Sequence, residues 1–319
     1  TAITERIENR GIKIEYLGKK RGFDPSIVSK MRKIIKAYQP DVIHTHRYVL
    51  PYAFLASMGL KAKRVHTVHN VAQKEQTKVG KNINRVLFRH FNVVPVALSE
   101  EIQKTIQEVY GLPISRVPVV FNGIDLSRCI VKESYARKDT FTVLHIGRFM
   151  DVKNQELLLR SFAWFKGQYS DARLQLLGDG ELKENMMQLA GQLNIADAVE
   201  FAGLQSNVYP WLHNADVFIL PSKFEGMPMT LIEAMGTGLP IIASNVGGIP
   251  DMLTDQKDAV LIEPKEDCVI SALELIYFDE EKRKYLGRNA RDRSAVFSEK
   301  TMAKRYIDVY IDASGEEVL

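Results

Sequence analysis

The chain has 319 residues and a mass of 36.2 kDa. Its 45% hydrophobic and 26% charged residues are typical of globular proteins and exclude collagen-like and disordered chains. Mean hydropathy is −0.14, and no apolar run approaches the ~18 residues that a membrane-spanning helix needs. The two cysteines, Cys129 and Cys268, are too few for a disulfide scaffold or a thiolate metal cluster, and reduced thiols in a cytoplasmic protein are expected.

The net charge of +4 is unevenly distributed. Residues 1–130 contain 22 Lys and Arg against 10 Asp and Glu, whereas residues 131–319 contain 21 against 29. This asymmetry suggests that the first half faces an anionic partner, such as acidic lipid headgroups or a phosphorylated substrate. No nucleic-acid-binding module is recognisable, so nucleic acid is not an expected partner.

Short apolar runs alternate along the chain with segments of helical periodicity. The runs expected to form strands are 12–17, 42–46, 64–69, 93–98, 117–121, 142–146, 173–177, 217–220, 240–243 and 259–262. The segments expected to form helices include 25–38, 100–110, 155–166, 181–193, 229–236 and 299–312. Such alternation is typical of parallel sheets covered by helices, and we expect an α/β protein with two doubly wound, Rossmann-like domains.

The clearest boundary between domains lies within residues 127–140, which are polar and aperiodic and lie where the charge asymmetry changes sign. We therefore predict an N-terminal domain at 1–130, a C-terminal domain at 131–298 and a closing helix with its tail at 299–319. A doubly wound domain usually begins with a strand and a glycine-rich turn, and nothing before Gly11 supplies them. The N-terminal domain is thus expected to be incomplete.

The most informative segment runs from Pro221 to Pro240, directly after a buried strand. Ligands of open α/β sheets bind at the carboxyl ends of strands. Pro228 suits the first turn of the helix that follows, and this helix points free N–H groups at that edge. Glu225 and Glu233 lie eight residues apart, and their acceptor-only carboxylates suit sugar hydroxyls better than phosphate. The alternative is a solvated helix with ordinary glutamates.

Three further strand ends carry candidate ligand-binding residues. After the strand at 142–146, Gly147 permits a turn, and Arg148 and Lys153 are suited to phosphate oxygens, although two surface cations are the alternative. Gly178 and Gly180 permit close approach of backbone to a ligand, or form a plain turn. The run 201–205 is placed to bracket a flat base, with the end of a core strand as the alternative.

Four histidines lie within 26 residues: His44 and His46 on one face of a strand, and His66 and His69 at the end of the next strand. A metal site is one interpretation, but no cysteine or patterned carboxylate completes it. The alternative is that one imidazole contacts a reacting group, and His69 is best placed for that role. His44 lies deeper in its strand and is expected to be a wall residue.

Two amphipathic segments are rich in cations. Residues 25–38 carry Lys30, Arg32, Lys33 and Lys36, and residues 78–89 interleave Lys78, Lys81, Arg85 and Arg89 with apolar side chains. They fit helices that cover a sheet with a solvated basic face, and the number of cations also suits contact with anionic lipid.

The run from Pro221 to Asp251 resembles the signature of retaining glycosyltransferases of family 4, which have the GT-B fold. Glu225-x7-Glu233 is that family's spacing, and further segments follow in the family's order: Asp41–His46, Thr67–His69, Asn122–Asp125, Gly147-Arg148 with Lys153, and Leu177–Gly180. The likeness extends from about Gly11 to about Tyr310. The chain departs from the family at Asp251, where Glu is usual. It also lacks the family's first strand and glycine-rich loop, so the resemblance implies a truncated N-terminal domain.

The resemblance implies an enzyme with two Rossmann-like domains facing an interdomain cleft. It would transfer a sugar from a nucleoside diphosphate sugar to a hydroxyl of a glycan, with retention at the anomeric carbon. The family analogy suggests cell-surface polysaccharide synthesis as the setting, and the glycan acceptor is therefore expected to be lipid-linked. His69 and Glu225 would be catalytic, His69 beside the anomeric carbon and Glu225 on the sugar hydroxyls. Glu233 would bind the donor ribose, and Arg148 and Lys153 its diphosphate. The implied donor-binding set is Gly147, Arg148, Lys153, Gly178, Gly180, Leu204, Gly226, Met227, Pro228, Met229, Thr230 and Glu233.

No metal or other cofactor is expected, because Arg148, Lys153 and the helix terminus supply positive charge. We expect a cytoplasmic protein that contacts the inner face of the cell membrane. Two rival functions stay open: a sugar-nucleotide epimerase on the same fold, and a non-catalytic subunit that binds a nucleotide sugar.

Overall fold

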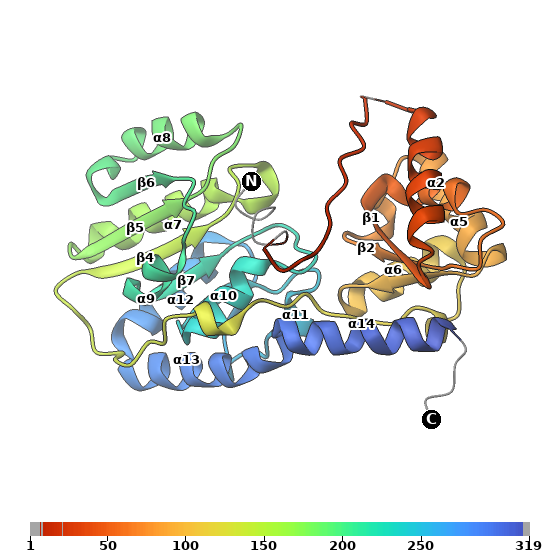
Figure 1. Ribbon diagram of the computed structural model, residues 1–319. Coiled ribbons are helices and arrows are strands. Elements are labelled where there is room, and N and C mark those ends of the chain that lie inside the picture. The colour runs from red at the N-terminus through yellow and green to blue at the C-terminus, as the bar shows by residue number, and fades with distance from the viewer. Residues whose placement is uncertain (1–6, 8, 21, 315–319) are drawn as a thin grey trace. The chain divides into compact units, whose positions relative to one another are not determined.

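The computed structural model describes residues 7, 9–20 and 22–314 (Figure 1). The chain forms two compact units. Unit 1 comprises Thr1–Val96, Ile106–Val117 and Tyr310–Leu319, and unit 2 comprises Ala97–Thr105 and Pro118–Val309. Residues 118–130 thus group with unit 2, whereas the predicted boundary lies at residue 130. The predicted closing helix is α14 (Glu299–Ser314), whose residues up to Val309 belong to unit 2.

Unit 1 contains a three-stranded sheet in the order β1-β2-β3, in which β1 and β2 are parallel. On β1 two apolar residues are followed by three polar ones, and only Thr45 is buried, whereas on β2 the last four residues are all buried. The fully buried Phe88 packs edge-on against Tyr110, with ring centroids 5.0 Å apart. The strands are β1 (Val42–His46), β2 (Lys63–Val68) and β3 (Val93–Ala97), and the helices are α2 (Ser26–Tyr38), α3 (Leu50–Ala56), α4 (Ala72–Glu75), α5 (Lys78–His90) and part of α6 (Glu100–Tyr110).

Unit 2 contains a six-stranded parallel sheet in the order β6-β5-β4-β7-β8-β9. The strands are β4 (Phe141–Ile146), β5 (Ala172–Leu177), β6 (Val199–Gly203), β7 (Val217–Leu220), β8 (Ile241–Ser244) and β9 (Val260–Ile262). The helices are α7 (Gln155–Gln168), α8 (Lys183–Gln192), α9 (Tyr209–Asn214), α10 (Met229–Thr237), α11 (Ile249–Met252), α12 (Glu266–Phe278), α13 (Glu280–Ser294) and most of α14.

The strand order in unit 2 reverses between β4 and β7. The chain builds β4, β5 and β6 toward one edge and then continues with β7 on the other side of β4. The loops that leave the carboxyl ends of β4 and β7 therefore diverge and open a crevice, where doubly wound sheets bind their ligands. Both strands are almost entirely buried. Accordingly, β7 is a continuous apolar run, and β4 is apolar except for Thr142 and His145.

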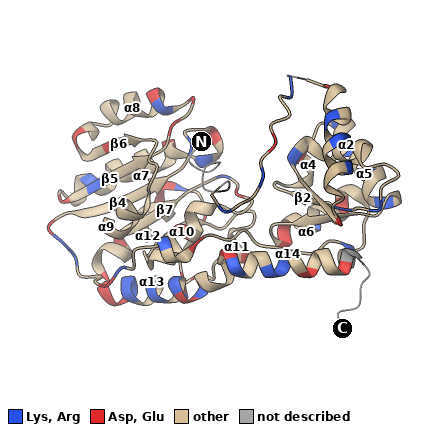
Figure 2. Cartoon of the chain, viewed as in Figure 1, with Lys and Arg blue, Asp and Glu red and all other residues tan. Residues whose placement is uncertain are grey.

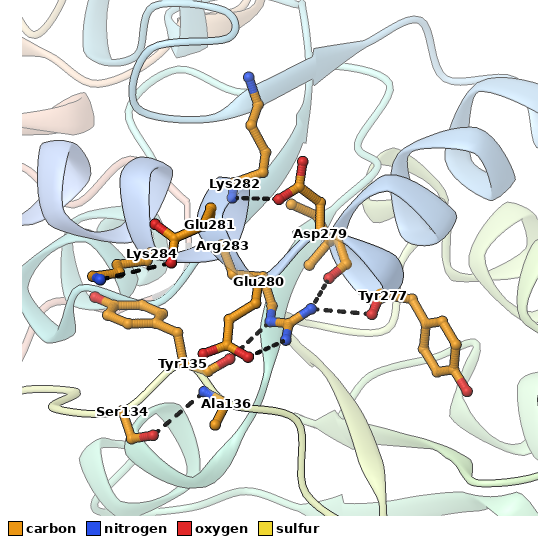
Figure 3. Close-up of polar contacts among 11 residues, drawn as sticks. Ser134, Tyr135, Ala136, Tyr277, Asp279, Glu280, Glu281, Lys282, Arg283 and Lys284 are labelled. Atoms are coloured by element: carbon orange, nitrogen blue, oxygen red, sulfur yellow. Dashed lines mark hydrogen bonds and ion pairs between the residues drawn. The ribbon is translucent and has the colours of Figure 1, made fainter.

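A buried arginine links three segments of unit 2 (Figure 3). Arg283, on α13, is 3% exposed and donates to the carbonyl oxygens of Ile276 and Tyr277 at the end of α12, at 2.6 and 3.0 Å. Its Nε donates to Tyr135 O at 2.9 Å. Arg283 thus caps α12, whose last carbonyls lack partners within the helix, and fixes the extended segment before β4.

Two of the predicted strands are wrong. Residues 12–17 join no sheet in the described part of the chain. Ile12 and Tyr16 are 57% and 76% exposed, so the apolar residues that suggested a strand have no sheet to pack on. Residues 117–121 form only a single bridge, between Val119 and Ala97, because Pro118 has no N–H to extend a ladder. Strand β6 was predicted only through its end at 201–205, because Glu200 interrupts the apolar run.

Candidate active site

The loops after β4 and β7 are joined by hydrogen bonds. Lys223 N donates to Val152 O at 2.8 Å, and Asn154 Nδ2 donates to Pro221 O at 3.1 Å. Asn154 has a φ of 58°, a left-handed conformation that asparagine tolerates and that ends the short 3-10 turn Asp151–Lys153 before α7. The two loops therefore form one structural element at the crevice.

A partly buried ion pair lies where these loops meet. Lys153 Nζ contacts Glu225 Oε1 at 2.7 Å, and their side chains are 17% and 10% exposed. Ser222 Oγ donates to the same Oε1 at 2.6 Å. The structure thus brings together two predicted site residues that lie 72 positions apart in the sequence.

Beside this pair is a pocket of about 480 Å³. It is lined by five predicted site residues, Gly147, Arg148, Gly178, Gly180 and Leu204, together with Ile146, Leu177, Asp179, Gln205 and Val208. A Cβ added at Gly147 would lie 3.4 Å from Lys153 Cδ, so the wall of the pocket and the ion pair are in contact.

The glycines of this pocket are required by their surroundings. Gly178 has a φ of 137°, and a Cβ there would lie 2.1 Å from Gly147 O. At Gly180, with a φ of 156°, a Cβ would lie 2.4 Å from Phe149 O. The turn after β5 therefore packs directly on the loop after β4, and any side chain would force the two backbones apart.

Arg148 has its backbone held firmly and its side chain in solvent. Gln155 Nε2 donates to Arg148 O at 3.0 Å and lies 3.3 Å from the buried His145. The Arg148 guanidinium pairs with Glu181 at 3.1 Å, and its side chain is 67% exposed. The two cations predicted as a pair for the diphosphate therefore have different environments, since only Lys153 is largely withdrawn from water.

The loop between Glu225 and α10 is packed through its backbone. Gly248 N donates to Glu225 O at 2.9 Å, and a Cβ on Gly248 would lie 2.0 Å from Gly226 O. Met227 is 8% exposed, and its sulfur accepts from Asn122 N at 3.0 Å, so its side chain faces the core. Pro228 occupies the N-cap of α10 and not, as predicted, its first turn.

Helix α10 begins at Met229 and carries the other predicted residues on its first turns. Met229 is 40% exposed and Thr230 is half-buried. Glu233 lies one turn further on and is also half-buried. Burial raises the pKa of Glu233 to about 7, and the nearby Arg128 opposes that shift. A carboxylate in this position therefore changes charge near neutral pH.

The four histidines cluster at the carboxyl ends of β1 and β2 in unit 1. His46 Nδ1 and His69 Nε2 lie 2.9 Å apart, so one of the two rings donates to the other. His44 bonds Tyr310 and Thr67 through its two ring nitrogens, as expected for a wall residue. His66 is fully buried beneath them.

The pKa values of these imidazoles are all lowered from the ordinary value of 6.5. Burial is the main cause that lowers the pKa of His69 and of His44 to about 4, and the neighbouring His46 adds to the effect. Among the described residues, no group of three or more His, Cys, Asp or Glu side chains is placed to hold a metal ion.

Sequence reasoning did not identify several contributors to this geometry. Ser222, Glu181 and Gln155 each contact a predicted residue, but a polar side chain in a loop or at a helix start gives no recognisable pattern. Gly247-Gly248 was part of the segment that carries the resemblance, and only the structure shows that it packs on Glu225 and Gly226.

Known proteins resemble this chain along most of its length. The family model described as glycosyl transferases group 1 matches residues 129–293, and that described as Glycosyltransferase Family 4 matches residues 3–128. The N-acetyl-alpha-D-glucosaminyl L-malate synthase of Bacillus anthracis is 29% identical over 92% of this chain and 81% of its own length. The UDP-Gal:alpha-D-GlcNAc-diphosphoundecaprenol alpha-1,3-galactosyltransferase of Escherichia coli is 26% identical over 90% and 79%.

Solved structures share the fold. HepE of Anabaena, crystallised with UDP and glucose, superposes with a TM-score of 0.82 at 18% identity and covers 96% of this chain and 88% of its own. A glycosyltransferase of Rickettsia africae superposes with a TM-score of 0.83 at 16% identity, covering 99% and 89%. With two parallel-sheet α/β units and both family models matched, the chain belongs to the glycosyl transferases group 1 family and is a glycosyltransferase with the GT-B fold.

Proposed function

We propose that this glycosyltransferase moves a sugar from a nucleoside diphosphate sugar to a hydroxyl of a lipid-linked glycan, with retention at the anomeric carbon. The observation that carries the proposal is the Lys153–Glu225 pair at the β4–β7 crevice, beside a pocket with glycine-lined walls. A cation for the diphosphate and an acceptor for sugar hydroxyls stand side by side there, while the pocket suits a base and ribose. A relative named for UDP-Gal and a diphosphoundecaprenol-linked acceptor supports the same class of donor and acceptor.

In the proposed reaction, the acceptor hydroxyl oxygen bonds to the anomeric carbon on the face that the diphosphate leaves. The bond between that carbon and the phosphate oxygen breaks, and the departing diphosphate takes the hydroxyl proton. Lys153, Arg148 and the N-terminus of α10 would stabilise the charge that develops on the diphosphate, so no metal is invoked. We expect donor affinity to be the same with and without EDTA, and a loss of affinity in EDTA would show that a metal is needed.

A thermal-shift screen with UDP-glucose, UDP-galactose, UDP-N-acetylglucosamine and GDP-mannose tests the proposal. A ligand that binds only the native state raises the melting temperature, and we expect at least one donor to do so. Incubating that donor alone then separates the rival functions: an epimerase converts it, whereas a transferase leaves it nearly intact. Donor binding with no transfer to any lipid-linked glycan acceptor would instead favour the non-catalytic subunit.

Donor binding should depend on pH through Glu233. Because burial raises the pKa of Glu233 to about 7, the carboxylate that accepts ribose hydroxyls is lost as the pH falls. We expect donor affinity about tenfold weaker at pH 6 than at pH 8 by calorimetry. In the Glu233→Gln variant the affinity should be lower throughout and independent of pH in this range. A wild-type affinity that does not change with pH would contradict the ribose role.

The raised pKa of Glu233 also affects the free energy of unfolding, which should fall, not rise, with increasing pH. The pKa of Glu233 is higher in the folded chain than its ordinary value of 4.5, so the folded state favours the protonated acid. Its contribution to the free energy of unfolding is present at low pH and is lost as the pH rises from about 4.5 through 7. Glu233→Gln should therefore flatten the stability profile in that window.

We also propose that unit 1 contacts the anionic inner face of the membrane through α5. Val79, Ile83 and Val86 form a stripe on this helix and are 69%, 39% and 48% exposed, while Leu87 and Phe88 face the core. The helix has no acidic residue, and its Lys and Arg residues are blue in Figure 2. At about 100° per residue, these cations fall on the helix face next to the stripe. This combination is typical of helices that lie in a bilayer interface. None of the helices in the described part of the chain is long and apolar enough to cross a membrane.

Co-sedimentation with vesicles tests this surface. Replacing Val79, Ile83 and Val86 together by serine should weaken binding to phosphatidylglycerol-containing vesicles by about tenfold or more, since both apolar burial and charge attraction contribute. Wild-type protein should bind pure phosphatidylcholine poorly. Met187→Ser, which removes an apolar side chain of 48% exposure from α8 of unit 2, is the matched control and should bind normally. Equal binding by the triple variant would overturn the role of α5.

A further inference from the structure

We propose that Ser222 is a positioning residue for Glu225: its hydroxyl fixes the carboxylate so that Oε2 faces the sugar of the donor. This inference rests on the proposed function, because it assigns Glu225 to the transferred sugar. Ser222 is fully buried, and its Oγ lies 2.6 Å from Glu225 Oε1. It is the second residue after β7, so its backbone position is set by the end of a buried strand.

The geometry divides the two oxygens of the carboxylate. Within the described residues, both hydrogen bonds to the Glu225 side chain, from Lys153 at 2.7 Å and Ser222 at 2.6 Å, end on Oε1. A carboxylate has about four acceptor sites, so Oε2 keeps its full capacity for hydroxyl groups of a ligand. Two hydrogen-bond donors on one oxygen also restrict the rotation of the carboxylate.

The two residues that donate hydrogen bonds to Glu225 respond differently when the nucleotide sugar binds. Lys153 is a flexible cation with three N–H groups, and in the proposed function it also binds the diphosphate. A contact shared in this way changes as the ligand enters. Ser222 has a short side chain on a fixed backbone and is fully buried, so its hydroxyl holds Glu225 throughout.

The backbone around Glu225 is fixed as well. Gly248 N donates to Glu225 O, and a Cβ on Gly247 would lie 2.0 Å from that oxygen. With both the main chain and Oε1 held, the remaining freedom of the residue is small. Pre-organisation of this kind is how a binding group avoids losing conformational entropy on contact with its ligand.

The experiment uses the donor sugar found in the thermal-shift screen and its parent nucleoside diphosphate. Calorimetry gives the affinity of each variant for both ligands. The affinity for the donor sugar divided by the affinity for the nucleoside diphosphate, called the ratio below, isolates the contribution of the sugar. Ser222→Ala should reduce this ratio by about tenfold, because a hydrogen bond to a charged group is lost. Affinity for the nucleoside diphosphate itself should stay within about twofold. Ser222→Thr, which keeps the hydroxyl, should restore most of the ratio.

Two controls separate positioning from a general loss of packing. Ser161→Ala removes another fully buried hydroxyl of unit 2, one that donates to Leu157 O within α7, and should leave the ratio unchanged. In a Glu225→Ala background, Ser222→Ala should have no further effect on the ratio, because Ser222 acts through that carboxylate.

The outcomes distinguish the two proposals. If Glu225→Ala lowers the ratio and Ser222→Ala does not, Ser222 has no positioning role, while the proposed function stands. If Glu225→Ala leaves the ratio unchanged, or no donor binds, the assignment of Glu225 to the sugar fails and the role of Ser222 fails with it. An equal loss of affinity for both ligands in Ser222→Ala would also overturn the inference.

Discussion

Replacing Lys153 by methionine is expected to weaken binding of the nucleoside diphosphate sugar by about 30- to 4000-fold, the range for truncating one partner of a largely desolvated charge pair. Lys153 is 17% exposed and 2.7 Å from Glu225, so its loss removes a cation from the crevice and leaves a carboxylate of 10% exposure without its counter-charge. That unpaired negative charge would also repel the diphosphate. Methionine keeps the length of the side chain and limits the change in packing.

A smaller effect on donor binding is expected at Arg148. Its side chain is 67% exposed and already paired with Glu181, and exposed ion pairs contribute at most about 1 kcal/mol. Arg148→Met should therefore weaken donor binding by less than about tenfold. Losses of equal size at both positions would show that Arg148 leaves Glu181 and becomes buried when the donor binds.

Lys223 provides the control for the Lys153 experiment. It lies on the loop after β7, pairs with Asp151 at 2.6 Å and is 50% exposed. Lys223→Met removes the same charge from the same pair of loops without touching Glu225, and donor affinity should change by less than about twofold. Calorimetry with the donor from the thermal-shift screen makes the comparison. A loss below tenfold in Lys153→Met would refute the diphosphate role of that residue.

The bounds predicted for β1, β7 and α6 coincide with the structure. For β7 and α6 the reason is local, because a fully buried run of four apolar residues and a clear helical period depend little on distant contacts. Strand β1 is only partly buried and has three polar residues, but its bounds coincide as well. The predicted strand at 12–17 failed for the opposite reason. Alternating Ile12, Ile14 and Tyr16 match a strand, but strand formation needs a neighbouring strand that local sequence does not reveal.

The candidate site was predictable as a set of loops, but its side-chain contacts were not. Strand ends that carry Gly147 and Glu225 could be placed at one crevice from the order of doubly wound sheets. That Lys153 bonds Glu225 directly, while Arg148 points into solvent, depends on rotamers that spacing does not determine. Ser222 was not predicted as a site residue, because a serine three residues before a glutamate is common in loops.

His69→Ala should reduce sugar transfer by about 100-fold or more while leaving donor affinity within about threefold. The family resemblance implies that His69 lies beside the anomeric carbon, and we propose that its neutral ring stabilises the charge that develops there. Its position depends on His46, whose Nδ1 lies 2.9 Å from His69 Nε2. His46→Ala should therefore cause an intermediate loss. His90→Ala, an exposed histidine at the end of α5, is the control and should transfer normally.

The pH dependence of transfer gives a second measurement on the same residue. Burial and His46 lower the pKa of His69 to about 4, so the ring stays neutral until the solution is strongly acidic. At saturating donor, turnover should hold between about pH 8 and 5 and fall only as the pH approaches 4. At low donor concentration an additional fall near pH 7 should appear, and Glu233→Gln should abolish it. Turnover that survives in His69→Ala, or that falls near pH 6.5 at saturating donor, would remove a neutral His69 from the mechanism.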